Sequence, residues 1–208
     1  MLAGTGSASS LVVGKNAVMS DLTDEGEGGT LSLGSGATVT INGASSLDNS
    51  TIEGNGALVL NDKLTLSGTA GLRGGNVVEL AKNDTASGTL DIGSTTGNAV
   101  SGLGGEGTLK SNGGDLSVNS GDTGSGHVFS GTLEGKGTLS ITGKAGQVLN
   151  NVVTASGSNW ALNNSGRLDI RMGGTVDDPK ANTALTLSSL TLGSGSTTNL
   201  TFNTDYAG

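Results

Sequence analysis

Six acidic residues occupy similar places in a repeated strand-like pattern, where pairs of carboxylates could cleave a polysaccharide. They are Glu53, Glu79, Asp91, Glu106, Glu134 and Asp169. In glycoside hydrolysis one carboxyl group protonates the leaving oxygen while another acts as base or nucleophile. Such enzymes usually also carry aromatic platforms and basic residues in the groove, and the chain has a single tryptophan, Trp160. We therefore expect these carboxylates to serve solubility, and keep a polysaccharide-active β-helix enzyme as an alternative.

The segment Gly-Asp-Thr-Gly-Ser-Gly, residues 121–126, contains an Asp-Thr-Gly sequence of the kind that carries catalytic aspartates. That chemistry needs a second carboxylate to share the proton, and the chain has no second copy of the sequence. His127, the only histidine, could join Asp122 and a serine in a triad, but a triad also needs a defined nucleophile turn and an oxyanion hole. We predict a polar turn here and no catalytic residue.

Metal and cofactor sites are also not expected. A zinc site needs several histidine, cysteine or carboxylate ligands, and His127 has no such companions. The acidic run from Asp21 to Glu27 is typical of a solvated loop. The glycine-rich stretch from Gly102 to Gly107 lacks the lysine and helix that follow a phosphate-binding loop. We predict no metal and no cofactor.

Hydroxyl side chains recur at alternate positions of the strand-like segments. Alternation places them on the outside of strands whose other side chains point inward. The residues concerned are Thr38, Thr40, Thr65, Ser140, Thr142, Thr186 and Thr191. Regular rows of hydroxyl groups can pair with the same face of another molecule, bind sugars, or hydrate the surface. We predict that these residues form binding faces.

The composition excludes several classes of protein. Among 208 residues there are 39 glycines, one proline and no cysteine, and the formal net charge is −8. Because the lysines and arginines are isolated, the basic footprint of a nucleic-acid-binding protein is missing. No stretch approaches the roughly 20 apolar residues of a transmembrane helix. The aliphatic residues alternate with polar ones, which a disordered glycine-serine linker does not show.

A short phrase recurs along the chain: Gly-x-Gly, then Thr or a similar residue, Leu, any residue, and an aliphatic residue. Its anchor leucines, Leu31, Leu58, Leu90, Leu109, Leu139 and Leu168, are separated by 27, 32, 19, 30 and 29 residues. Loose repeats in this range are typical of solenoids. We expect the phrases to lie directly above one another and to share an aliphatic interior.

Short strands are expected throughout, with no amphipathic helix. Each segment alternates apolar and polar residues and is bounded by Gly, Asn, Asp and Ser. The expected strands are residues 30–33, 38–41, 57–60, 63–66, 77–80, 89–92, 115–118, 138–141, 167–170, 184–187, 190–192 and 199–202. Two-residue Asn-Gly or Asp-Gly hairpins are scarce between them, which favours a parallel arrangement over antiparallel pairs. The sequence predicts an all-β fold, a single-stranded parallel β-helix (β-solenoid) of roughly eight rungs.

One unit of this repeat cannot fold alone. Ordering about 27 residues costs roughly 1–2 kcal/mol each in backbone entropy, while the four or so inward aliphatic side chains return about 1.5–3 kcal/mol each. The units must therefore stack, and with no cysteine the stack depends on backbone ladders and aliphatic contacts. We expect residues 1–208 to be one β-helix segment of a longer protein, with a distinct strand pair at 184–208.

Two phrases carry a family resemblance. The run from Gly131 to Gly143, Gly-Thr-Leu-Glu-Gly-Lys-Gly-Thr-Leu-Ser-Ile-Thr-Gly, and the run from Gly105 to Leu109 resemble the passenger-associated repeat of bacterial autotransporters. The run from Leu185 to Phe202 is similar to the strands that follow such repeats in AIDA-like passengers. The resemblance covers most of the chain and is specific for architecture rather than activity.

The resemblance implies a right-handed β-helix displayed on the surface of a Gram-negative bacterium and attached to an outer-membrane β-barrel in the full-length chain. It also implies adhesion or self-association, leading to aggregation and biofilm growth. The expected partner is another copy of the chain on a neighbouring cell, or a host-surface glycan or protein, and not nucleic acid. A passive stalk that carries a distal functional domain is the alternative within the same family.

Overall fold

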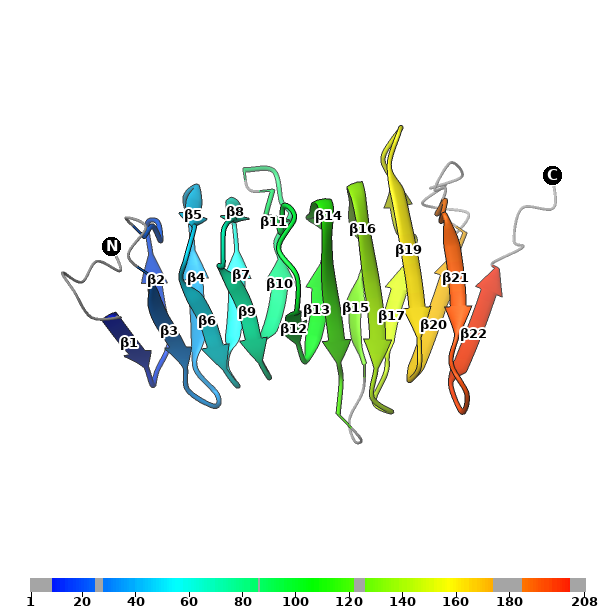
Figure 1. The fold of residues 1–208 in the computed structure, drawn as a ribbon, viewed down its shortest axis with the longest axis horizontal. Helices are drawn as coiled ribbons and strands as arrows, with labels where there is room; N and C mark the ends of the chain where they lie inside the picture. The colour runs from blue at the N-terminus through cyan, green and yellow to red at the C-terminus, as the bar shows by residue number, and fades with distance from the viewer. Residues whose placement is uncertain (1–8, 25–27, 86, 122–125, 174–184, 203–208) are drawn as a thin grey trace.

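The computed structural model describes residues 9–24, 28–85, 87–121, 126–173 and 185–202. The described chain forms a right-handed parallel β-solenoid in which short strands lie across a long axis (Figure 1). Every ladder between its strands is parallel, so successive turns of the chain stack in the same direction. The predicted fold class is confirmed.

The strands form three faces, which the chain visits in the order 1, 2, 3 on each turn. Face 1 contains β1 (Ser9–Val13), β3 (Gly29–Leu33), β6 (Thr51–Gly54), β9 (Gly71–Gly74), β12 (Asn98–Val100), the second halves of β14 (Thr108–Asn119) and β16 (Thr132–Thr142), β19 (Asn159–Asn164) and β21 (Ser189–Leu192). Face 2 contains β2 (Ala17–Met19), β4 (Thr38–Ile41), β7 (Ala57–Leu60), β10 (Val77–Leu80), β13 (Gly102–Gly105), β15 (His127–Phe129), β17 (Gln147–Asn150), β20 (Arg167–Met172) and β22 (Thr197–Phe202). Face 3 contains β5 (Ser45–Leu47), β8 (Lys63–Leu66), β11 (Thr89–Asp91), the first halves of β14 and β16, and β18 (Val153–Thr154).

The core is a set of aliphatic columns that run along the axis. On face 1, Leu31 pairs with Ile52 and Ile52 with Leu72, and all three are fully buried. On face 2, Leu60 pairs with Leu80 in the same way. Because each inward side chain lies on the one from the previous turn, every turn buries the apolar side of its neighbour. Trp160 and Phe129 are also fully buried in this core.

The recurring phrase does not mark one position of the turn, which corrects the expectation that its copies lie directly above one another. Leu31 and Leu139 lie on face 1, Leu58 and Leu168 on face 2, and Leu90 and Leu109 on face 3. Among these six leucines only Leu90 and Leu109 are register partners. The real turn is shorter than the spacing of the phrases, because Thr51 pairs with Gly71, only 20 residues further on.

Stacked glycines at the corners explain what the phrase encodes. Gly88, Gly107 and Gly131 each precede a Thr-Leu pair that opens a strand of face 3. A Cβ on Gly107 would lie 2.0 Å from the carbonyl oxygen of Gly88, and one on Gly131 would lie 2.0 Å from that of Gly107. The backbone of the next turn therefore passes too close for any side chain. The phrase is a strand start after a corner, and it is used on all three faces.

The expected strands at residues 38–41, 57–60, 63–66 and 77–80 coincide with β4, β7, β8 and β10, and most of the others fall within observed strands. The exception is the segment 184–187: residue 184 lies outside the described residues, and 185–187 form no strand. β21 and β22 extend the solenoid in parallel, on β19 and β20 respectively. The boundary of a distinct unit at 184–208 stays a prediction.

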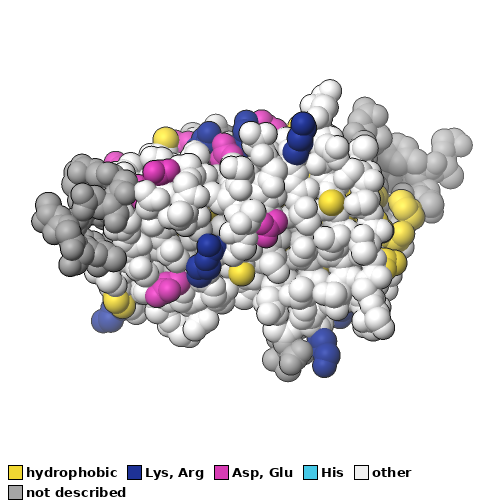
Figure 2. Space-filling model, in the orientation of Figure 1, with side chains coloured by type: hydrophobic (Ala, Val, Ile, Leu, Met, Phe, Trp, Pro, Cys, Tyr) yellow, Lys and Arg dark blue, Asp and Glu magenta, His cyan; other side chains and the backbone are white. Residues whose placement is uncertain are grey.

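Apolar side chains come to the surface at the C-terminal end of the described rod, where yellow atoms gather in Figure 2. Leu192, Leu200 and Phe202 are more than half exposed, at 56%, 55% and 67%. These residues belong to β21 and β22, which end the stacking order of their sheets. No described strand lies over them, so their inward faces lack the cover that earlier turns have.

Candidate functional site

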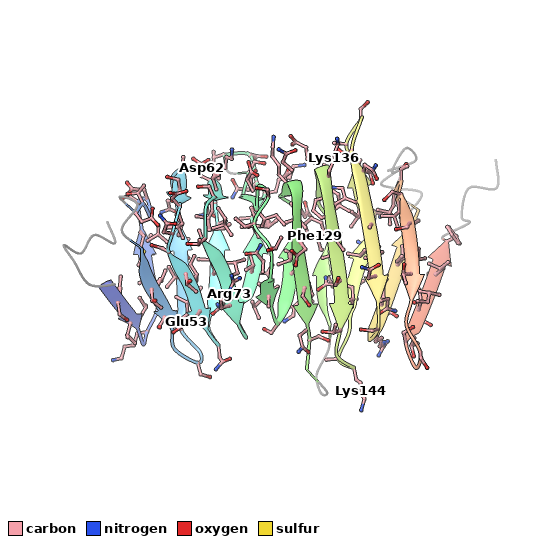
Figure 3. The ribbon with its side chains drawn as sticks, in the orientation of Figure 1. Glu53, Asp62, Arg73, Phe129, Lys136 and Lys144 are labelled. Atoms are coloured by element: carbon pink, nitrogen blue, oxygen red, sulfur yellow. The ribbon has the colours of Figure 1, made fainter. Side chains whose placement is uncertain are left out.

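The six carboxylates singled out from the sequence are spread over different faces. Glu53 lies on face 1, where it accepts a hydrogen bond from the Ser32 hydroxyl at 3.0 Å and is a register partner of Arg73; Figure 3 labels both residues. Glu79 and Asp169 lie on face 2, with β13, β15 and β17 between their strands. Glu106 lies in the turn after β13.

Asp91 and Glu134 share face 3, two strands apart and about 10 Å from each other along the axis. Each is paired with a lysine: Lys63 Nζ lies 3.1 Å from Asp91, and Lys110 Nζ lies 2.5 Å from Glu134. The hydrogen bond to Glu134 raises the pKa of Lys110. These carboxylates form a row of alternating charges that pairs neighbouring strands, and the prediction of no enzymatic activity stays a prediction.

The protease-like segment and the histidine are separated in what can be described. Residues 122–125, and residues 25–27 of the acidic run, lie outside the described residues. His127 lies on face 2 with its Nδ1 3.8 Å from Glu79 Oε1, and its ring covers Gly102. Among the described residues, no group of three or more His, Asp or Glu side chains could hold a metal ion.

The seven hydroxyl residues do not form one surface. Thr38 and Thr40 lie on face 2 and Thr65 on face 3. Thr186 precedes β21, where its backbone exchanges two hydrogen bonds with the Thr154 hydroxyl. The other three, Ser140, Thr142 and Thr191, share face 1.

A row of small polar side chains on face 1 contains two of these three. Ser117, Ser140, Asn163 and Thr191 are consecutive register partners on β14, β16, β19 and β21, and we call them the polar row. Their side chains alternate with the buried Leu139 and Leu162, so they point outward. None of the four has a side-chain hydrogen bond to another described residue. Their hydroxyl and amide groups are therefore open to an external partner.

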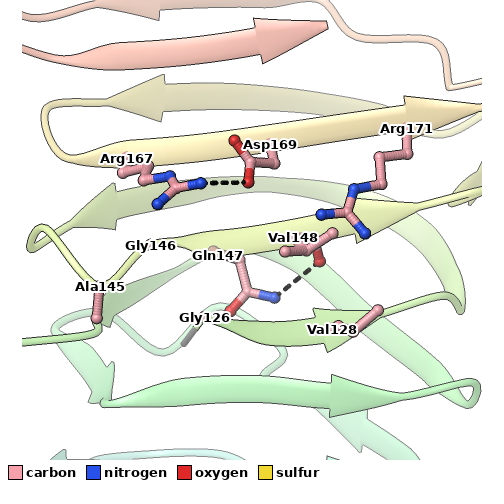
Figure 4. Close-up of a pocket in the computed structure, with 9 residues that line it drawn as sticks. All are labelled: Gly126, Val128, Ala145, Gly146, Gln147, Val148, Arg167, Asp169 and Arg171. Atoms are coloured by element: carbon pink, nitrogen blue, oxygen red, sulfur yellow. Dashed lines mark hydrogen bonds and ion pairs between the residues drawn. The ribbon is translucent and has the colours of Figure 1, made fainter. Parts of the chain in front are cut away.

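Face 2 carries a cavity between β15, β17 and β20, shown in Figure 4. Its volume is about 220 Å³, and we call it the arginine cavity. It is lined by Gly126, Val128, Ala145, Gly146, Gln147, Val148, Arg167, Asp169 and Arg171. Two further hollows adjoin it along β20, one sharing Arg167 and the other sharing Asp169 and Arg171.

The alternation of β20 places three charged side chains on its outer side. Leu168 and Ile170 point into the core, so Arg167, Asp169 and Arg171 point outward. Asp169 accepts one hydrogen bond from Arg167 Nη2 at 3.1 Å and another from Asn199 Nδ2 at 2.6 Å. Arg171 has no ion pair or side-chain hydrogen bond with any described residue. Its guanidinium extends from β20 toward Val148 in Figure 4.

Gln147 supports the cavity from below. The strands β13 and β15 share only one register pair, Gly105 with Phe129, so the ladder is open beside Leu103. The Gln147 amide fills the opening: its Nε2 donates to Leu103 O at 2.8 Å and His127 O at 3.0 Å, and its Oε1 accepts from Leu103 N at 3.2 Å. The side chain is 1% exposed and links two turns of the rod.

Sequence reasoning missed this cavity, although a signal was present. Of its charged residues only Asp169 was singled out, and then as a solubility residue. The strand Arg-Leu-Asp-Ile-Arg, residues 167–171, alternates charged and aliphatic residues, so both guanidinium groups must share the outer side. Trp160, considered as a sugar platform, is fully buried and offers no exposed ring.

Comparison with protein-family models, with curated proteins and with solved structures finds no match to this chain. Among the described residues there is no helix long and apolar enough to cross a membrane.

Proposed function

We propose that this chain is a surface-displayed adhesive segment of an autotransporter passenger, and that it associates with a second copy of itself through the polar row on face 1. The observation that carries the proposal is the outward row of Ser117, Ser140, Asn163 and Thr191, whose polar groups have no described partner inside the molecule. The resemblance of the repeats to passenger repeats supports the surface location.

The polar row fits a partner of the same kind because it carries no charge. Two copies that meet along it can exchange hydrogen bonds between hydroxyl and amide groups without burying an unpaired charge. Parallel stacking repeats these groups about every 4.8 Å along the axis, so a match at one turn is repeated at the next.

The other surfaces offer less for such pairing. On face 3, Asp91 and Glu134 are engaged by lysines. On the first turns of face 1, Glu53 is engaged by Ser32. Each contact on the polar row is weak, so a useful affinity requires several turns to engage together, as in other multivalent interactions.

The test is the oligomeric state of Ser140→Asp. We expect the parent chain to form a dimer that grows with concentration in light scattering, and Ser140→Asp to stay monomeric because like charges would meet across the interface. Thr40→Asp on face 2 is the matched control, since Thr40 is also an outward, half-buried hydroxyl residue. A parent that stays monomeric at high concentration favours the stalk, and a dimer unaffected by Ser140→Asp overturns the role of face 1.

A further inference from the structure

We propose that the arginine cavity binds an anionic sugar residue of an acidic polysaccharide, with the carboxylate or sulfate of the sugar held by Arg171. The proposal concerns face 2 and stands independently of self-association through face 1.

The first argument is the state of the two guanidinium groups. Asp169 holds Arg167 in place and is itself held by Asn199, so that pair is satisfied internally. Arg171 lines the same cavity with its charge uncompensated by any described residue. A guanidinium presents a planar set of donors that matches the two oxygens of a carboxylate or sulfate. An anion is the ligand that completes this arrangement.

The second argument is the floor of the cavity. Val128 and Val148 face outward beneath the arginines, and glycines keep the surface beside them low. A Cβ on Gly126 would lie only 2.5 Å from the carbonyl oxygen of Gly146, so no side chain can rise there. An apolar floor with cations at one side suits a pyranose ring, whose C–H groups pack on valine while its acidic group turns to the arginine.

The third argument is size and continuity. The cavity of about 220 Å³ is smaller than the roughly 300–1,000 Å³ of sites for drug-sized ligands, and is suited to a single sugar ring. The adjoining hollows are lined by polar groups, including Ser165 and Thr197 on one side and Asn199 and Thr201 on the other. A polysaccharide running along β20 would therefore meet further hydroxyl and amide groups beyond the first ring.

The local charge agrees with a polyanionic ligand. Residues 126–173 contain two lysines and two arginines against one glutamate and one aspartate, a balance of +2 in a chain whose total is −8. An acidic peptide fits less well, because peptides usually bind by adding a strand to a free sheet edge, whereas β20 is paired on both sides by β17 and β22.

The test is calorimetric titration with a short oligogalacturonate, using its neutral methyl ester as the comparison ligand. We expect Arg171→Gln to weaken binding at least about tenfold, since charged hydrogen bonds are lost, and the methyl ester to bind poorly. Lys136→Gln is the control, because Lys136 is an exposed cation at the corner after face 3, away from the cavity. Circular dichroism of each variant verifies that the solenoid is intact.

Two further ligands distinguish the source of the anion. A heparin-derived oligosaccharide that binds more tightly than oligogalacturonate, with the same dependence on Arg171, assigns the site to sulfated glycans. Hexaglutamate that binds as tightly as either sugar overturns the sugar assignment. Absence of binding to both sugars, or equal binding by Arg171→Gln and the parent, overturns the site. Ser140→Asp should bind the sugar normally, so a failure of either proposal is recognised separately.

Discussion

Gln147 and Asn98 each place a buried side-chain amide where the backbone ladder between two turns is interrupted. Asn98 Oδ1 accepts from Leu72 N at 3.1 Å on face 1, and Gln147 does the same for Leu103 on face 2. A buried backbone group without a partner costs about 1–3 kcal/mol. The two amides therefore let the solenoid change its register locally without leaving unsatisfied groups in the core.

We expect Gln147→Leu to lower the free energy of unfolding by about 2–4 kcal/mol, because the N–H and C=O of Leu103 both lose their partner while the volume is nearly kept. Urea unfolding followed by circular dichroism measures the change. Asn150→Ala, on the outer side of the same strand, is the control and should change the midpoint little. An unchanged midpoint for Gln147→Leu would show that water reaches Leu103 and replaces the amide.

Strand β20 shows how much of the candidate site a sequence can predict. Alternation alone decides that Arg167, Asp169 and Arg171 share one side of the strand. It does not decide which strand lies alongside, and the cavity exists only because Val148 and Gly146 of β17 fall next to those residues. Register between distant strands depends on the lengths of the intervening corners, which local patterns do not report.

Corners, rather than strands, set the geometry of this molecule. The strands of residues 38–41, 57–60 and 63–66 follow directly from alternation. The anchor leucines misled because the same strand-start phrase follows corners of all three faces, so its spacing mixes whole turns with partial ones. Short strands such as β13, Gly-Leu-Gly-Gly, have too few side chains to show any pattern, and only the stacking of neighbours makes them strands.

The glycine column predicts a sharp contrast between two glycine-to-alanine changes. Gly131→Ala should destabilise the protein by about 1–3 kcal/mol, because its Cβ would clash with the Gly107 carbonyl and the Phe129 ring. Gly14→Ala should be neutral or slightly stabilising, since nothing lies within 4 Å of that Cβ. Thermal or urea unfolding compares the two variants. Equal effects would mean that the corner can widen to accept a methyl group.

The whole rod divides its surface by turn and by face. The row of alternating charges lies on face 3, the polar row lies on the later turns of face 1, and the arginine cavity lies on the later turns of face 2. Figure 3 shows Lys136 and Lys144 at opposite edges of this later part. Because each turn contacts only its neighbours, such surfaces can change independently while the core columns stay the same.

Removal of one complete turn tests this modular picture of the molecule. Deletion of residues 51–70 removes β6, β7 and β8 and joins Ser50 to Gly71, so Leu72 would stack on Leu31 and Val78 on Val39. Aliphatic residues again meet aliphatic residues, and stability should fall by roughly the share of one turn in about eight. We expect a strand-rich circular dichroism spectrum and a cooperative urea transition. Deletion of residues 51–60 alone removes two faces of a turn, brings Lys63 to Leu66 where face 1 belongs, and should abolish that transition. If both deletions behaved alike, the turn of 20 residues between Thr51 and Gly71 would not be the unit that holds the rod together.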